Sequence, residues 1–384
     1  MSIYLDNAAT TPLSSEVFTK MEPFLFNSFA NPSSTHTAGR NARYAVELSR
    51  KIIAENLNTT ADHIFFTSGG TEGDNMAILS AIHANKIKVV ITSRLEHHAV
   101  LNTLRKAEND GLILIKYLDN DAQGRISLTQ LNSLLDGSDQ VLISLMHANN
   151  EIANLNPLEE IADLAEHYGA VFHSDTVQSI GHYHYDTRLL CPDYLVGSAH
   201  KFHGPKGVGF IYAKQPESLK SIINGGSQER GKRAGTENVS GIVGAAAAIQ
   251  DIYQNQVEHE FYLKSLKSTL INGLSVLPEI TFNGESANIN DSLSTVLSVS
   301  FPQSLTEFNL LETLDAAGIY ASGGSACSGN NSSHVISSLS ALSNKNTIRF
   351  SFSKYNTISE IEKVIAVVKN YFEPLHNQSN LQSA

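Results

Sequence analysis

Short apolar runs alternate with helical patterns between about residues 63 and 213. Segments with helical spacing, such as "LEEIADLAEHYG", separate several of the runs. Continuous apolar strands separated by helices are typical of a mainly parallel sheet with helices on both faces. The pattern therefore predicts a large α/β domain. Its strand candidates are "HIFFT", "KVVITS", "LILIKYL", "QVLISLMH", "AVFHSD", "DYLVGS" and "GVGFIYAK".

The pattern changes beyond about residue 237. A stretch from "ENVSGIVG" to "STLINGL" predicts one long helix that leads away from the sheet. The same pattern is compatible with a kink within this helix. The segments "STVLSVSF" and "NTIRFSFS" predict strands. In the last helix, apolar residues recur in steps of three and four and form one stripe, which predicts a buried face. These features indicate a smaller α+β domain. The stripe consists of Ile358, Ile361, Ile365, Val368 and Phe372.

Composition narrows the class of protein. The chain has 384 residues, 41% of them hydrophobic, which is enough for a substantial buried core. It carries 27 Lys+Arg against 38 Asp+Glu, a net charge of -11, which disfavours non-specific binding to nucleic acid or to an anionic membrane. We find no long apolar span and no signal-peptide pattern at the start, so we expect a cytoplasmic protein.

Only two cysteines occur, and their surroundings differ. Cys191 lies in "LLCPDYLVG", just before an apolar run, where a small buried hydrophobic residue is the plainer interpretation. Cys327 lies in "ASGGSACSGNN" and has no apolar neighbours that would explain it in that way. A reducing compartment keeps such residues as thiols. Cys327 is therefore a candidate for chemistry.

Polar residues that follow the predicted strands are the first candidates for a binding site, because ligands of open α/β sheets bind at the carboxyl ends of the strands. In "FFTSGGTEGDN", Ser68, Gly69, Gly70 and Thr71 come between a strand and a helix. Free backbone N–H groups and a hydroxyl at such a position suit an anion. The alternative is a plain turn in which Thr71 caps the helix.

Two further strand ends carry reactive residue types. Asp175 ends "AVFHSD", with Gln178 three residues later, and it is either a helix cap or an acid that pairs with a buried cation. Lys201 ends "VGSAHK", after Ser198 and His200, and it is either a surface residue or a nucleophile. An anion cradle, an acid for a cationic ring nitrogen and a lysine for a Schiff base together indicate pyridoxal phosphate.

Ten segments in chain order carry a resemblance to a known family. The chain resembles the cysteine desulfurases of the NifS/IscS type, which are pyridoxal-phosphate enzymes of the class V aminotransferase group, from residue 4 to about 353. The segments are "YLDNAATTP", "NPSSTHTAGR", "FTSGGTEGDN", "SRLEHHAV", "MHANNEIA", "SDTVQSIG", "SAHKFHGPKGVG", "GGSQERGKRAGTENV", "SGGSACS" and "TIRFSFS".

The resemblance implies a fold and a domain division. The fold is that of α/β pyridoxal-phosphate-dependent transferases, the aspartate aminotransferase-like fold type I. The large domain, with a mainly parallel sheet, is expected to span residues 11–259 and to bind the cofactor. The small α+β domain is expected to comprise residues 1–10 and 260–384 and to carry a catalytic cysteine loop at about 321–334.

Cofactor contacts follow from the resemblance position by position. It implies that Lys201 binds the cofactor as a Schiff base, that Asp175 pairs with the pyridine nitrogen and that Gln178 faces the ring oxygen. His97 matches a histidine that stacks on the ring and moves protons. The phosphate contacts are Gly70, Thr71, Ser198, His200 and Thr236, of which Thr236 is supplied by the neighbouring subunit of a homodimer.

The resemblance also implies the substrate side of the site. Arg349 matches the arginine that clamps the substrate carboxylate, and Asn150 lies beside both cofactor and substrate. Asn7, Ala8 and Ala9 are expected to line the same side, and no metal site is implied. Cys327 is then the nucleophile that takes sulfur from L-cysteine as a persulfide, leaves L-alanine, and passes the sulfur to an acceptor for iron–sulfur cluster assembly or tRNA thiolation.

Some alternatives stay open at this point. His98 stands where many relatives have lysine, and Ala199 replaces a glycine. The segment after Cys327 and the C-terminal tail are shorter than in the best-known members of the family, and this leaves the identity of the sulfur acceptor open. Selenocysteine as the main substrate is another alternative. Cys327 argues against a plain aminotransferase, and the presence of all the reactive residues argues against a binding protein that has lost catalysis.

Overall fold

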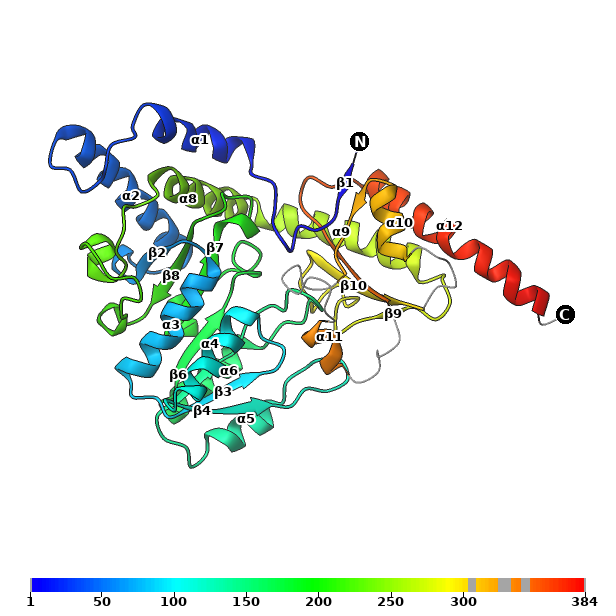
Figure 1. The fold of residues 1–384 in the computed structure, drawn as a ribbon, viewed down its shortest axis with the longest axis horizontal. Helices are drawn as coiled ribbons and strands as arrows, with labels where there is room; N and C mark the ends of the chain where they lie inside the picture. Colours follow the sequence, from blue (N-terminus) through cyan, green and yellow to red (C-terminus); the bar gives the residue numbers. More distant parts are fainter. Residues whose placement is uncertain (1, 303–308, 324–332, 340–345, 383–384) are drawn as a thin grey trace.

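The computed structural model describes residues 2–302, 309–323, 333–339 and 346–382 (Figure 1). A seven-stranded sheet with the order β2-β8-β7-β6-β5-β3-β4 forms the centre of the larger part. β8 runs antiparallel to β2 and β7, and the other neighbours are parallel. All seven predicted strands are therefore confirmed. They are β2 (Ile64–Thr67), β3 (Val89–Ser93), β4 (Leu114–Leu118), β5 (Val141–Ser144), β6 (Val171–Asp175), β7 (Tyr194–Ser198) and β8 (Gly209–Ala213).

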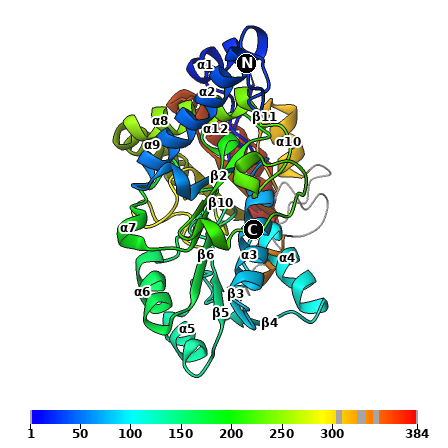
Figure 2. The same ribbon diagram turned by 90° about the vertical axis from the view of Figure 1, so that its left-hand side faces the viewer.

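Helices cover both faces of this sheet (Figure 2). α3 and α4 pack on one face, and α2, α5, α6 and α8 pack on the other. Both faces of the sheet are apolar because successive side chains of a strand point to opposite faces. In β2, for example, Phe65 packs in the core with α3 and α4, and Phe66 packs in the core on the other face. The helices are α1 (Ser15–Phe26), α2 (Thr37–Asn56), α3 (Gly70–Ala84), α4 (His98–Asn109), α5 (Leu128–Leu135), α6 (Leu158–Tyr168), α7 (Thr187–Leu190) and α8 (Val239–Gln254).

The predicted long helix after residue 237 is two helices. α8 ends at Gln254 and α9 (Gln256–Leu274) begins two residues later. Asn255 between them has φ -113° and ψ 15°, so the α-helical hydrogen-bond ladder is interrupted there. α9 then leaves the sheet and enters a second core.

The second core belongs to the smaller part of the molecule. A three-stranded antiparallel sheet has the order β12-β10-β9, and the short parallel pair β1 and β11 lies beside it. As predicted, the apolar stripe of the last helix, α12, packs into this core. The domain division stays a prediction, and its boundary at 259/260 lies inside α9. The elements are β1 (Ile3–Tyr4), β9 (Thr281–Phe282), β10 (Val296–Phe301), α10 (Leu310–Ala316), β11 (Ile319–Tyr320), α11 (His334–Ser338), β12 (Asn346–Ser351) and α12 (Ile358–Gln382).

A lysine lies inside this second core. Lys267 on α9 is fully buried, and its Nζ donates hydrogen bonds to Ser292 Oγ at 2.7 Å and to Leu293 O at 2.9 Å. Burial lowers the pKa of this amine to about 7. A neutral amine has two N–H groups, which match the two acceptors. Lys267 therefore ties α9 to the segment that precedes β10.

We expect Lys267 to make stability depend on pH. An unfolded lysine titrates near pH 10.4, whereas Lys267 titrates near pH 7 in the folded protein. Between these values the unfolded state binds more protons, so the free energy of unfolding rises with pH. Relative to Lys267→Met, the wild type should gain about 3 kcal/mol between about pH 7 and pH 9.5. Urea unfolding of both proteins across this range measures the gain, and parallel pH profiles would contradict it.

No helix in the described ranges is both long enough and apolar enough to cross a membrane.

Candidate active site

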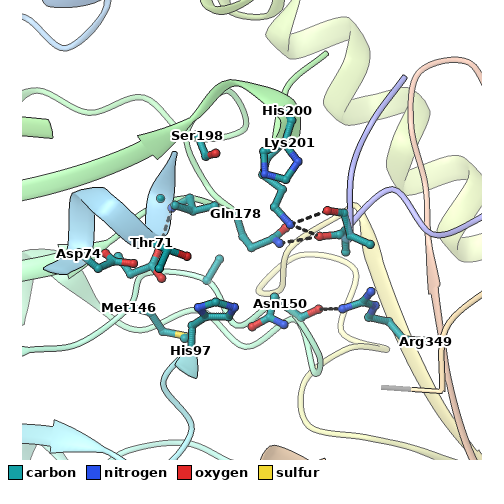
Figure 3. Close-up of a pocket in the computed structure, with 16 residues that line it drawn as sticks. Thr71, Asp74, His97, Met146, Asn150, Gln178, Ser198, His200, Lys201 and Arg349 are labelled. Atoms are coloured by element: carbon teal, nitrogen blue, oxygen red, sulfur yellow. Dashed lines mark hydrogen bonds between the residues drawn. The ribbon is translucent and has the colours of Figure 1, made fainter. Parts of the chain in front are cut away.

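A cavity of about 200 Å³ lies at the carboxyl edge of the seven-stranded sheet, where the smaller part of the molecule meets it (Figure 3). The structure brings twelve of the predicted site residues to its lining. Parallel strands end at one edge, so the residues that follow β3, β5, β6 and β7 meet there. The twelve are Ala8, Ala9, Gly70, Thr71, His97, Asn150, Asp175, Gln178, Ser198, His200, Lys201 and Arg349.

One end of the cavity suits an anion. α3 begins at Gly70, so the N–H groups of its first turn have no carbonyl within the helix to bind. Ser198, at the end of β7, lines the cavity with Thr71, and its buried Oγ has no hydrogen-bond partner in the part of the chain that the structure describes. A Cβ added at Gly70 would lie 2.6 Å from Val177 Cγ2, so the close approach of α3 to the segment after β6 requires glycine. These groups fit a phosphate.

Lys201 reaches into the cavity from the short 3₁₀ turn after β7 (Ala199–Lys201). Its Nζ donates hydrogen bonds to Ala8 O at 2.5 Å and to Ala9 O at 2.9 Å. Gln178 Nε2 donates to the same Ala8 O at 2.9 Å. The lysine amine therefore lies where the N-terminal segment crosses the carboxyl edge of the sheet.

Arg349 comes from β12 in the smaller part and is 1% exposed. One terminal nitrogen donates to Asn150 O at 3.0 Å, and the other forms an ion pair with Asp6 Oδ1 at 2.8 Å. Among the described residues, no hydrogen-bond partner exists for its buried Nε atom. The guanidinium group is thus held in a fixed orientation at the lining, with donor capacity left for a carboxylate.

His97 caps the N-terminus of α4 and faces the cavity. Its Nδ1 accepts a hydrogen bond from Ala99 N at 3.1 Å. Burial lowers the pKa of the ring, and the charge of Asp175 partly opposes that shift. The ring is therefore neutral near pH 7, and Nε2 is the nitrogen that can exchange a proton with a ligand.

Asp175 ends β6 and is 8% exposed. Its Oδ1 accepts a hydrogen bond from Val177 N at 2.9 Å. Burial raises the pKa of this carboxyl group, while nearby His97 and Lys201 oppose the shift. A ring cation bound in the cavity would favour the ionised form of Asp175. The acid predicted for a cationic ring nitrogen is thus in a position that suits the role.

Sequence reasoning missed Asp74. This residue lies in the first turns of α3, is 1% exposed and lines the cavity beside Asp175. The sequence could have indicated it, because the motif "TSGGTEGDN" places an acid four residues after Gly70. A helix period brings such a residue back to the same face.

Three predicted site residues lie elsewhere or outside the described residues. The Nδ2 of Asn7 donates to Ser351 O at 2.8 Å, and Asn7 lines a smaller neighbouring cavity instead. Thr236 lines a separate cavity with Glu229 and Arg233. Cys327 lies outside the described residues, as does most of the loop predicted at about 321–334. The roles of all these residues stay predictions.

Comparisons with known proteins support the resemblance. Residues 3–364 match the family model described as aminotransferase class-V. A cysteine desulfurase IscS of Methanosarcina thermophila is 39% identical, over 99% of this chain and 94% of the relative. A solved structure of a NifS-like protein is 33% identical, with a TM-score of 0.87, over 98% of this chain and 100% of that one. A NifS-like protein from Rickettsia africae is 30% identical, with a TM-score of 0.84, over 97% and 100%. These matches confirm the predicted resemblance and fold class.

Proposed function

The chain belongs to the class-V aminotransferase family, and we propose that it is a cysteine desulfurase, which takes sulfur from L-cysteine and leaves L-alanine. Relatives of that name match nearly the whole chain, which supports the proposal. The observation that carries it is the convergence of Lys201, Asp175 and the N-terminus of α3 on one cavity. That combination suits pyridoxal phosphate.

The residues present fit this cofactor. The N-terminus of α3, Thr71 and Ser198 Oγ would hold its phosphate, and no other described residue forms a hydrogen bond with Ser198 Oγ. Asp175 would face the pyridine nitrogen, and Lys201 would bond to the carbonyl carbon of the cofactor. When bound, pyridoxal phosphate supplies an electron sink that makes the α-hydrogen of an amino acid acidic.

Other residues of the chain would bind and orient the substrate. Arg349 would take the carboxylate of L-cysteine, because its guanidinium group is already oriented by Asp6 and by Asn150 O. Lys201 Nζ would remove the α-proton of the substrate, and His97 Nε2 would exchange a proton with it. The thiolate of Cys327 would take the sulfur atom and hold it as a persulfide.

The direct test is the reaction itself. Purified protein supplied with pyridoxal phosphate, L-cysteine and a thiol reductant should release alanine and sulfide in equal amounts. Alanine by chromatography and sulfide by a colorimetric assay measure the two products. An aminotransferase would instead form a keto acid without equal sulfide, and a selenocysteine lyase would show a much higher kcat/KM for selenocysteine. Either result would contradict the proposal.

We also propose a homodimer. Thr236 lines a different cavity from the one that holds Lys201, which suits a contact to the site of a neighbouring subunit. Large apolar side chains are exposed on and between α1 and α2, and a subunit interface would cover them. Sedimentation should give twice the chain mass of 41.7 kDa, and a monomer with full cofactor occupancy would contradict the proposal. These side chains are Leu25, Phe26, Phe29 and Tyr44.

The fate of the sulfur belongs to the same proposal. A persulfide on Cys327 would pass to an acceptor protein, for iron–sulfur cluster assembly or for tRNA thiolation. We propose a cytoplasmic location, because a reducing compartment keeps Cys327 as the thiol that this transfer needs.

A further inference from the structure

The short helix α11 packs against the larger part of the molecule, although β11 and β12, which flank it along the chain, belong to the smaller part (Figure 1). Val335 and Leu339, which are 1% and 3% exposed, form a small apolar cluster with Leu95 and Ile152. Leu95 follows β3 and Ile152 follows β5, so both lie at the carboxyl edge of the seven-stranded sheet. α11 is therefore attached at the edge where the cavity lies.

Ser333 ties the start of α11 to a residue next to the cavity lining. Its Oγ donates a hydrogen bond to Glu151 Oε2 at 2.5 Å and accepts one from Ile336 N at 3.1 Å. The first bond serves a carboxyl group that is 2% exposed, and the second caps the N-terminus of α11. Glu151 directly follows Asn150, which lines the cavity. A shift of α11 would therefore take this donor away from a buried carboxyl group.

His334 contacts the residues on both sides of His97. Its Nε2 lies 2.9 Å from Glu96 O, and a carbonyl oxygen only accepts, so Nε2 carries a proton and donates it. The ring centroids of His334 and His98 are 4.5 Å apart. His97, between Glu96 and His98, lines the cavity. His334 thus attaches α11 to the N-terminus of α4, within one residue of the proposed site.

These contacts provide one of two fixed points on either side of Cys327. The other is Ser322, which exchanges backbone hydrogen bonds with Arg349 at 2.7 and 3.2 Å. Cys327 lies five positions after Ser322 and six before Ser333, and six residues of fully extended chain span at most about 22 Å. Arg349 lines the cavity, and Ser333 binds beside its lining. The two fixed points therefore limit how far the Cys327 thiol can lie from the cavity.

We propose that Ser333 and His334 are positioning residues for the sulfur-transfer step, because they hold α11 on the larger part and so keep the Cys327 thiol close to the bound substrate. Without these contacts, the fixed points around Cys327 would be Ser322 and Asn346, where β12 begins, which is about twice the length of chain. The effective concentration of a tethered group falls roughly as the −3/2 power of the tether length, so the thiol would meet the substrate about threefold less often.

The inference rests on the proposed function, in which the thiolate of Cys327 attacks the sulfur atom of L-cysteine. The new S–S bond forms as the C–S bond breaks, and the electron pair of the broken bond stays on the carbon skeleton, which is protonated to L-alanine. Exchange of the α-hydrogen of L-alanine for deuterium would need Lys201 but no thiol. Comparison of the two reactions therefore separates the placement of Cys327 from damage to the rest of the site.

His334→Ala removes the donor to Glu96 O and the contact with His98. The rate of alanine formation from L-cysteine in the first turnover should fall by about threefold. The α-hydrogen exchange of L-alanine in heavy water and the visible absorbance of the bound cofactor should stay at wild-type values. His334→Gln keeps an N–H donor and should restore the first-turnover rate. Rapid quenching with chromatography measures alanine, and mass spectrometry measures the incorporated deuterium.

A second variant loosens α11 through a different contact. Val335→Asp places a carboxylate in the apolar cluster with Leu95 and Ile152, where an unpaired charge is too costly for the helix to stay docked. It should lower the first-turnover rate at least as much as His334→Ala, again with wild-type exchange of L-alanine. Ser337 is on the exposed side of α11, so Ser337→Ala is the matched control and should keep both rates.

Amide hydrogen exchange tests the docking of α11 without cofactor or substrate. Peptides that cover residues 333–339 should exchange faster in His334→Ala and Val335→Asp than in the wild type and Ser337→Ala. A wild type that formed no alanine from L-cysteine would contradict the proposed function. The amide exchange would still decide, in that case, whether His334 and Val335 hold α11 in place.

Three results would overturn the inference. Unchanged amide exchange in His334→Ala would show that this side chain does not hold α11. Faster amide exchange together with a wild-type first-turnover rate would show that docking of α11 does not place Cys327. Equal losses of the first-turnover rate and of the α-hydrogen exchange would show that the whole cavity was damaged, so that the effect was not specific to sulfur transfer.

Discussion

Lys201→Ala should abolish covalent attachment of the cofactor and lower kcat for alanine formation by roughly a thousandfold or more. The Nζ of Lys201 lies in the cavity with Asp175, and it is the amine that we propose both for attachment and for proton transfer. No alanine side chain can replace either role. Borohydride reduction followed by mass spectrometry should find the cofactor on the Lys201 peptide of the wild type and not of the variant.

An exposed lysine nearby provides the control. Lys206 lies five residues further on and faces solvent, so Lys206→Ala should keep both the covalent cofactor and the rate. Loss of Lys201 also removes two hydrogen bonds to Ala8 O and Ala9 O, so the folding of the variant has to be compared by thermal unfolding. A folded Lys201→Ala protein that kept a covalent cofactor would contradict the assignment.

Cys327→Ala should remove sulfide release from L-cysteine while leaving cofactor binding intact. Only a thiolate can take the sulfur as a persulfide, and alanine has no group to do so. We expect a loss of at least about a hundredfold in the rate under reductant. The visible absorbance of the bound cofactor should stay that of the wild type, because no cofactor contact is assigned to Cys327.

The second cysteine is the matched control. Cys191 lies before β7, at the opposite end of that strand from Ser198, and its Sγ donates a hydrogen bond to Arg188 O at 3.2 Å. It lines a separate cavity with Asp193 and Lys214. Cys191→Ala should therefore release sulfide at the wild-type rate. If Cys327→Ala also kept the wild-type rate, the persulfide role of Cys327 would be wrong.

The periodicity of the chain determined the sheet. Seven apolar runs became seven neighbouring strands, because a strand buried on both faces needs an unbroken run of apolar side chains. The order of the strands within the sheet could not be predicted in this way, because several different strand orders would bury the same apolar runs. The possible kink in the long helix could not be placed at Asn255, where α8 and α9 separate, because both helices continue the same helical spacing.

Local motifs also identified most of the candidate site. A glycine before a helix, an acid after one strand and a lysine after another lie at the same edge of a parallel sheet, so their convergence in one cavity follows from topology. Asn7 and Thr236 show the limit of this reasoning. Each belongs to a segment that matches the family, but neither lines the cavity that holds Lys201. Asn7 lines the smaller neighbouring cavity, and Thr236 lines a separate one.

Sequence alone thus determined which residue types are available and at which strand ends they lie, because both depend on neighbours along the chain. Tertiary structure decided which of them interact. Glu151 and Ser333 are 182 positions apart, and Lys267 meets Ser292 across a core. Proton positions and pKa values in such groups depend on burial and on neighbours in space, which no local pattern encodes.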